Sequence, residues 1–112
     1  MTAAEFRRLA LALLEAVEGS HMGHADFRVR RKIFATLGPD ETWGMVKLTP
    51  AEQTRLVREE PAVYEPAKGA WGRGGATLVR LARARKTTVK PALESAWRNV
   101  APKALVRRFD EE

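Results

Sequence analysis

Residues 27–37 read Phe-Arg-Val-Arg-Arg-Lys-Ile-Phe-Ala-Thr-Leu, and they carry the clearest structural signal in the chain. Phe27 and Val29 alternate with arginines, which is the two-residue period of a strand with one buried face. A second apolar run, residues 33–37, follows almost at once. The pattern predicts two antiparallel strands joined by a tight turn near Arg31.

Further strands are expected on both sides of this hairpin. Residues 38–41, Gly-Pro-Asp-Glu, form a strong turn signal after it. Four glycines between residues 67 and 75 predict an irregular loop, because glycine adopts backbone conformations closed to other residues. The other expected strands are residues 20–24 (weakened by Gly23), 43–48, 63–64 and 77–82.

Three helices are expected among these strands. Thr2 and Glu5 have the spacing of a capping box, and the apolar face that follows extends to Val17. Thr49 opens a second helix in the same way, and Thr87 or Thr88 opens a third. The apolar side chains assigned to the core include Phe34, Trp43, Met45 and Trp97.

The order of these elements is helix, three to four strands, helix, two strands, helix. Such an order is typical of an α+β fold in which helices pack on one face of an antiparallel sheet. A chain of 112 residues is most consistent with one domain, which we place at residues 1–109. The acidic residues 110–112 are expected to fray.

Composition narrows the classes of function. The net charge is +6 and the isoelectric point is near 10.3, so the molecule should be drawn to phosphates. The chain has no cysteine, which excludes disulfides, thiolate metal sites and cysteine nucleophiles and fits a reducing cytoplasm. No apolar run approaches the roughly 20 residues that span a bilayer, so no membrane partner is expected. Catalytic signatures are absent too, and nothing in the sequence favours an enzyme.

Basic residues are concentrated in two places. Between Glu65 and Glu94 there are seven basic residues and no acidic one to pair with them. The hairpin of residues 27–37 carries a second cluster, in which Arg28 and Arg30 are expected to share one sheet face. Both clusters suit phosphate contacts, although ordinary solvated surfaces would look the same. The two clusters consist of Lys68, Arg73, Arg80, Arg83, Arg85, Lys86 and Lys90, and of Arg28, Arg30, Arg31 and Lys32.

Trp71 and Arg73 lie in the glycine-rich segment. An aromatic plane beside a guanidinium could stack on a base and contact its phosphate. The spacing of the glycines is not that of a nucleotide-binding P-loop. Trp71 could equally fold back into the core, and the sequence leaves the two possibilities open.

His21, His24 and Asp26 invite a metal site, since imidazole and carboxylate groups are common zinc ligands. The spacing is weak outside a helix, and no third strong ligand is near in sequence. Local hydrogen bonding of these side chains is the preferred interpretation. We therefore predict no metal and no cofactor.

Taken together, the motifs resemble the MmcQ/YjbR family over nearly the whole chain. The resemblance implies a compact fold similar to the CyaY-like proteins, also described as a double wing, whose members are often labelled DNA-binding. Arg31 stands where glycine is common in the family, and Leu14 where proline is common. The matching motifs are Phe27-Arg28-Val29-Arg30, residues 32–37, residues 43–48 with Thr49-Pro50, Trp71-Gly72-Arg73, Gly75-Ala76-Thr77, Ala96-Trp97-Arg98 and Ala101-Pro102-Lys103.

Charge and resemblance together lead to the hypothesis of a DNA-binding protein that contacts phosphates and reads bases little. The alternative is a small-molecule or protein-binding module with a pocket near Trp71, His21 and His24. A contiguous basic face with Trp71 outside would favour DNA, and an inward Trp71 beside a cavity would favour the module. The sequence gives no oligomeric state. The expected nucleic-acid contacts are Arg28, Arg30, Arg31, Lys32, Lys68, Trp71, Arg73, Arg83, Arg85, Lys86 and Lys90.

Overall fold

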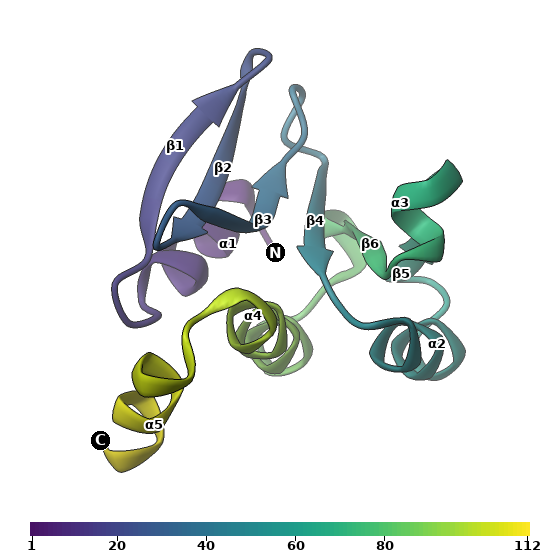
Figure 1. Ribbon diagram of the computed structural model, residues 1–112. Coiled ribbons are helices and arrows are strands. Elements are labelled where there is room, and N and C mark those ends of the chain that lie inside the picture. Colours follow the sequence, from purple (N-terminus) through teal and green to yellow (C-terminus); the bar gives the residue numbers. More distant parts are fainter.

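A six-stranded antiparallel sheet, in the order β1-β2-β3-β4-β6-β5, is the frame of the protein (Figure 1). The computed structural model describes residues 1–112. The expected α+β class with an antiparallel sheet is confirmed. The strands are β1 (Val17–His21), β2 (His24–Val29), β3 (Lys32–Leu37), β4 (Trp43–Lys47), β5 (Tyr64–Pro66) and β6 (Ala76–Arg80).

The hairpin expected from residues 27–37 is formed by β2 and β3. Its two turn residues, Arg30 and Arg31, both have positive φ angles, of 49° and 70°. Glycine or asparagine is usual in such turns, so two arginines here hold a less favourable backbone. A bulge between Phe27 and Arg28 shifts the register, and Phe34 and Ala35 are both fully buried.

Two helices, α1 (Ala3–Leu11) and α4 (Lys86–Val100), pack against each other on one face of the sheet. In Figure 1, α1 lies behind the strands and α4 below them. Phe6 and Trp97 come from these helices and are fully buried together with Phe27 of β2. The indole Nε1 of Trp97 donates a hydrogen bond to the carbonyl oxygen of Leu14 at 3.0 Å. These side chains form the centre of the core.

Three further helices complete the chain, and a short 3₁₀ turn (Leu81–Arg83) joins β6 to α4. The last helix extends to Glu111 and so includes two of the residues that were expected to fray, and both oxygens of Asp110 accept hydrogen bonds from Arg98. No helix has the length and apolar content needed to cross a bilayer. The three are α2 (Pro50–Glu59), α3 (Gly69–Arg73) and α5 (Lys103–Glu111).

Both expected capping boxes are confirmed. The hydroxyl of Thr2 accepts from the backbone N–H of Glu5 and that of Thr49 from the N–H of Glu52, while each glutamate accepts from the threonine's own N–H. The third helix differs, because α4 begins at Lys86 and neither Thr87 nor Thr88 caps it.

Three other expectations were wrong in detail. The first helix ends at Leu11, and Val17 instead opens β1, where pairing with β2 overrides the local helical period. The glycine-rich segment contains α3 rather than only a loop. Trp43 and Met45 are half-buried on the sheet face opposite the core. That face has no large helix over it, and only α3 lies at its border.

Candidate functional site

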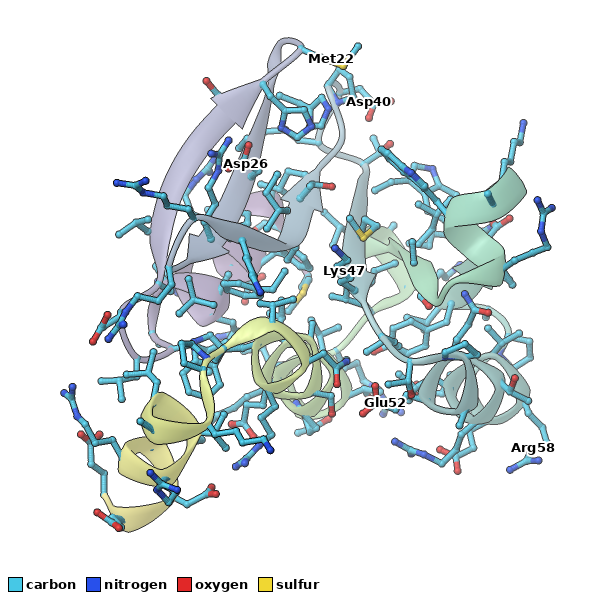
Figure 2. The ribbon with its side chains drawn as sticks, viewed as in Figure 1. Met22, Asp26, Asp40, Lys47, Glu52 and Arg58 are labelled. Atoms are coloured by element: carbon cyan, nitrogen blue, oxygen red, sulfur yellow. The ribbon has the colours of Figure 1, made fainter.

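A groove of about 600 Å³ lies on the open face of the sheet, the face turned away from α1 and α4. It extends from the turn between β1 and β2 across the sheet to α3. Figure 2 shows Met22 at the tip of that turn and Lys47 near the end of β4. The lining residues are His21, Met22, His24, Ile33, Thr36, Met45, Lys47, Ala67, Ala70, Trp71, Gly74, Ala76 and Leu78.

The floor of the groove is made by strand register. Thr36 of β3 is the direct partner of Met45 of β4, which in turn is the partner of Leu78 of β6. Cross-strand partners project to the same face, so these three side chains form a row. All three are half-buried. The strand expected at residues 43–48 therefore contributes Met45 to the floor of the site, although the sequence analysis assigned Met45 to the core.

One wall is α3, which holds Trp71 with 74% of its surface exposed. The position of α3 depends on two glycines. A Cβ atom on Gly72 would lie 1.7 Å from the carbonyl oxygen of Ala67, and one on Gly75 would lie 1.9 Å from that of Leu48. Gly75 also has a φ of 114°, which other residues rarely adopt. Trp71 is thus not a core plug, and the glycines serve close packing of the backbone.

Gln53 of α2 fixes α3 from below. Its side-chain amide donates hydrogen bonds of 2.9 Å to the carbonyl oxygens of Gly72 and Ala76, and the residue is buried. The same two oxygens also accept backbone hydrogen bonds from Gly75 and Ala67, so Gln53 adds a second hydrogen bond to each and links α2 to both ends of this segment. The sequence analysis missed Gln53, because only the tertiary structure brings α2 beneath α3.

Met22 forms the opposite lip of the groove. Its side chain is 90% exposed, and its φ of 51° together with 81° at Gly23 matches a left-handed two-residue hairpin turn. Asparagine or glycine is the usual first residue of such a turn, and methionine there adds backbone strain. An exposed, strained apolar residue at the edge of a groove is a feature of binding surfaces.

Asp26 lies beside the groove and is completely buried. Arg28 donates two hydrogen bonds to its carboxylate, at 2.6 and 2.9 Å, and the Nδ1 of His21 lies 2.7 Å from it. The hydrogen bonds from the Arg28 guanidinium lower the pKa of the Asp26 carboxyl to about 2, against the opposing effect of burial. Asp26 is therefore ionised, and His21 must donate through Nδ1, leaving its Nε2 free.

His24 faces His21 across the hairpin, with 4.5 Å between ring centroids. The Nδ1 atom of His24 is buried and has no hydrogen-bond partner. No group of three or more histidine, cysteine, aspartate or glutamate side chains is arranged to hold a metal ion. The expected local hydrogen bonding is present between His21 and Asp26, while His24 stands outside it.

The hairpin cluster of basic residues does not share one face. Arg28 is paired with Asp26 on the open face, whereas Arg30 turns away and pairs with Glu15 at 2.6 Å. The positive φ of Arg30 accounts for the difference, because the strand alternation has already ended there. Arg31 and Lys32 form no ion pair and remain exposed.

The acid-free run also divides between two sides of the molecule. Lys68 directly precedes α3 and Arg73 is its last residue, and neither has an acidic partner. The segment entering α4 instead adjoins α1, because Lys86 pairs with Glu5 at 3.2 Å and the Met1 amine donates to the carbonyls of Leu81 and Ala84. Arg83, Arg85 and Lys90 lie in this second region and are exposed and unpaired.

Acidic residues distant in sequence supply partners that the run itself lacks. Besides the Lys86–Glu5 pair, Arg80 approaches Glu65 at 3.7 Å and stacks over the ring of Trp43. The run itself contains no acidic residue, as the sequence shows, but residues outside it pair with two of its cations. Two other residues of the site, Met22 and Lys47, were not among the candidates. Lys47 is the only lysine or arginine that lines the groove, and it has no ion-pair partner.

Comparisons with known proteins agree with this fold. The model of the YjbR family matches residues 11–99, which is most of the chain. The chain belongs to the YjbR family. A crystal structure of the Deinococcus radiodurans protein DR2400, with a DUF419 domain, is similar with a TM-score of 0.76 at 15% identity, over 97% of this chain and 88% of that one. At 15% identity, this similarity supports the fold of the YjbR protein and carries no information about its function. A comparison with curated proteins finds no match.

Proposed function

We propose that this YjbR protein is a ligand-binding module, and that the open-face groove takes a small molecule with a largely apolar body. The observation that carries the proposal is the groove itself, bounded by Met22 and Trp71, the two most exposed large apolar side chains. Concave, mostly apolar sites with a few polar groups are the usual form of small-molecule sites. The volume of about 600 Å³ lies within the range of such sites.

Two features support binding over an incidental hollow. Exposure of an apolar side chain to water does not stabilise a fold, yet Met22 is exposed at the rim of the groove on a turn with a strained backbone. The wall bearing Trp71 is also firmly built, through Gln53 and the two close-packed glycines. Rigid support for an exposed aromatic residue is expected of a binding site.

Titration with the uncharged dye N-phenyl-1-naphthylamine tests the proposal. Binding should raise its fluorescence, and Trp71→Ala should weaken binding about tenfold, because a large contact area is lost. Leu11→Ala is the matched control, since Leu11 is an exposed apolar residue on α1, away from the groove. A dye that fails to bind, or equal affinities for the two variants, would disprove the proposed function.

Nucleic acid is the second candidate, supported by the exposed Lys68 and Arg73 on either side of Trp71 and by the net charge of +6. Single-stranded nucleic acid commonly stacks on aromatic residues beside cations. A salt titration tests it, because phosphate contacts lose affinity steeply between low and physiological salt. Affinity that stays flat with salt would argue against this candidate. For either function we place the protein in the cytoplasm, in keeping with a chain free of cysteine.

A further inference from the structure

The ends of the groove are far apart. His24 on β2 and Lys47 on β4 are separated by two strand spacings across the sheet and about four residues along it. With strands about 4.8 Å apart and about 3.3 Å per residue, this diagonal is roughly 16 Å. His21 on β1 extends it by one more strand. An occupant that fills the groove is therefore extended rather than globular.

The floor offers side chains but no free backbone groups. β3, β4 and β6 are interior strands, each paired on both edges. The floor side chains Ile33, Met45 and Leu78 are apolar. A peptide lying here would press its own N–H and C=O groups against these side chains without partners, which costs free energy. A chain of methylene groups has no such groups to satisfy.

The groove carries one lysine and no carboxylate. Lys47 lines it without an acidic partner, and the remaining polar lining is Thr36 and the two histidines. Extended single-stranded nucleic acid would bring several phosphates along a groove of this length and would require several cations within it. One unpaired ammonium matches one anionic group.

We propose that the ligand is an extended aliphatic chain with a single carboxylate head, and that the carboxylate binds the Nζ of Lys47. The chain then crosses Met45 and the floor towards Met22, with Trp71 covering one side. This inference rests on the proposed function of the groove and adds the class of ligand and its direction. Asn99 donates to the backbone carbonyl of Lys47 at 3.0 Å and so holds the end of β4 to α4.

Chain length provides one test. A saturated chain advances about 1.25 Å per carbon when bonds of about 1.5 Å are fully extended, so roughly twelve to fourteen carbons span the groove. Affinity should rise about threefold to fourfold for each added methylene. The rise should stop beyond this length, when further carbons reach solvent. Displacement of N-phenyl-1-naphthylamine by hexanoate, octanoate, decanoate, dodecanoate and hexadecanoate, below their micelle concentrations, measures it.

The head group provides the decisive test. Dodecanoate and dodecan-1-ol share a chain and differ in charge. Dodecanoate should displace the dye about threefold to tenfold more effectively, and Lys47→Gln should abolish this preference while leaving the alcohol unchanged. Lys103→Gln removes an exposed lysine on α5 outside the groove, and it should keep the preference.

The outcomes separate the two proposals. Equal displacement by acid and alcohol, or a preference that survives Lys47→Gln, would overturn the inference even if the dye binds in the groove. A dye that does not bind, or binds regardless of Trp71, would overturn the proposed function as well. Retention of the acid preference in Lys103→Gln together with its loss in Lys47→Gln would support both.

Discussion

Asp26 is the only charged residue that the fold buries completely, and it organises the polar end of the groove. Gly19 makes room for it, since a Cβ atom there would lie 2.9 Å from one carboxylate oxygen and 3.2 Å from the Nε of Arg28. The pair with Arg28 compensates the loss of hydration that burial imposes. The carboxylate in turn fixes which ring nitrogen of His21 carries the proton.

The Asp26 pKa predicts how stability depends on pH. Because the folded pKa is lowered from an ordinary 3.8 to about 2, the carboxylate adds stability that is complete above about pH 5. That contribution, on the order of 2 kcal/mol, should fall as pH drops below the ordinary pKa and vanish below about pH 2. Urea unfolding of the wild type and of Asp26→Asn between pH 2 and 7 measures it.

The two curves should converge at low pH. At neutral pH Asp26→Asn should be less stable by about 2 kcal/mol, because Arg28 loses its charged partner. Asp40→Asn is a control, since that exposed carboxylate only accepts local bonds from Thr42. A stability gap between wild type and Asp26→Asn that stays constant down to pH 2 would show that Asp26 is not the group responsible.

Met22 is expected to lower the stability of the fold and to increase the affinity of the groove for its ligand. Replacing it by asparagine places a favoured residue in the left-handed turn before Gly23, and unfolding should become harder by about 0.5–1 kcal/mol. The same change removes an apolar lip from the groove, so dye affinity should fall severalfold. Thermal unfolding and dye titration of one variant report both effects. Lower stability or unchanged affinity would contradict the role assigned to Met22.

At the scale of elements, α3 is a five-residue helix that cannot be stable by itself. It is held by backbone packing at Gly72 and Gly75 and by the side chain of Gln53. The binding wall therefore depends on α2, which supplies Gln53 from outside the groove. Trp71 is positioned by contacts that it does not make itself.

Gln53→Met should loosen this wall. The substitution keeps the volume but removes two buried hydrogen bonds, at a cost of about 1–3 kcal/mol in unfolding free energy, while each carbonyl keeps its backbone donor. Amide hydrogen exchange should accelerate in residues 69–75 more than in the interior strands. Thr54→Ala, one residue along α2, is the control because its hydroxyl bonds only within the helix. Exchange that rises evenly across the protein would argue against a local role.

At the scale of the whole molecule, the unpaired basic residues between Glu65 and Glu94 form two separate regions. Lys68 and Arg73 lie at the two ends of α3, and Arg83, Arg85 and Lys90 lie where the chain enters α4 beside α1. The screening length at physiological salt is about 8 Å, so fields on opposite sides of a small domain add weakly. A polyanion would therefore engage one region at a time.

Charge reversal distinguishes the two regions. If nucleic acid binds, we expect it on the α3 side, where an exposed aromatic residue is available. The double variant Lys68→Glu/Arg73→Glu should lose at least tenfold in affinity and reduce the salt slope by about two. The matched double variant Arg83→Glu/Arg85→Glu should change affinity little. Equal losses in both, measured by fluorescence anisotropy with single-stranded DNA, would contradict this placement.

The local features were predictable because their causes are local. The two-residue alternation of residues 27–37, the turn at residues 38–41 and the capping boxes at Thr2 and Thr49 all depend on neighbours within about four positions. The sheet of antiparallel strands followed from them. Of the candidate site, the sequence alone singled out Trp71 and the two histidines, which do line one groove.

Tertiary structure decided the rest, because the deciding contacts join residues far apart in the chain. Val17 belongs to β1 and not to the first helix, because it pairs with β2. The segment around Trp71 is helical, and Gln53 and the close packing of two glycines hold it in place. Acidic partners such as Glu5 for Lys86 could not be read from a run of basic residues. Lys47 lines the groove because strand register places it on the open face of the sheet. The alternation of a strand shows which side chains share a face, but it does not show which of the two faces is covered by helices and which stays open.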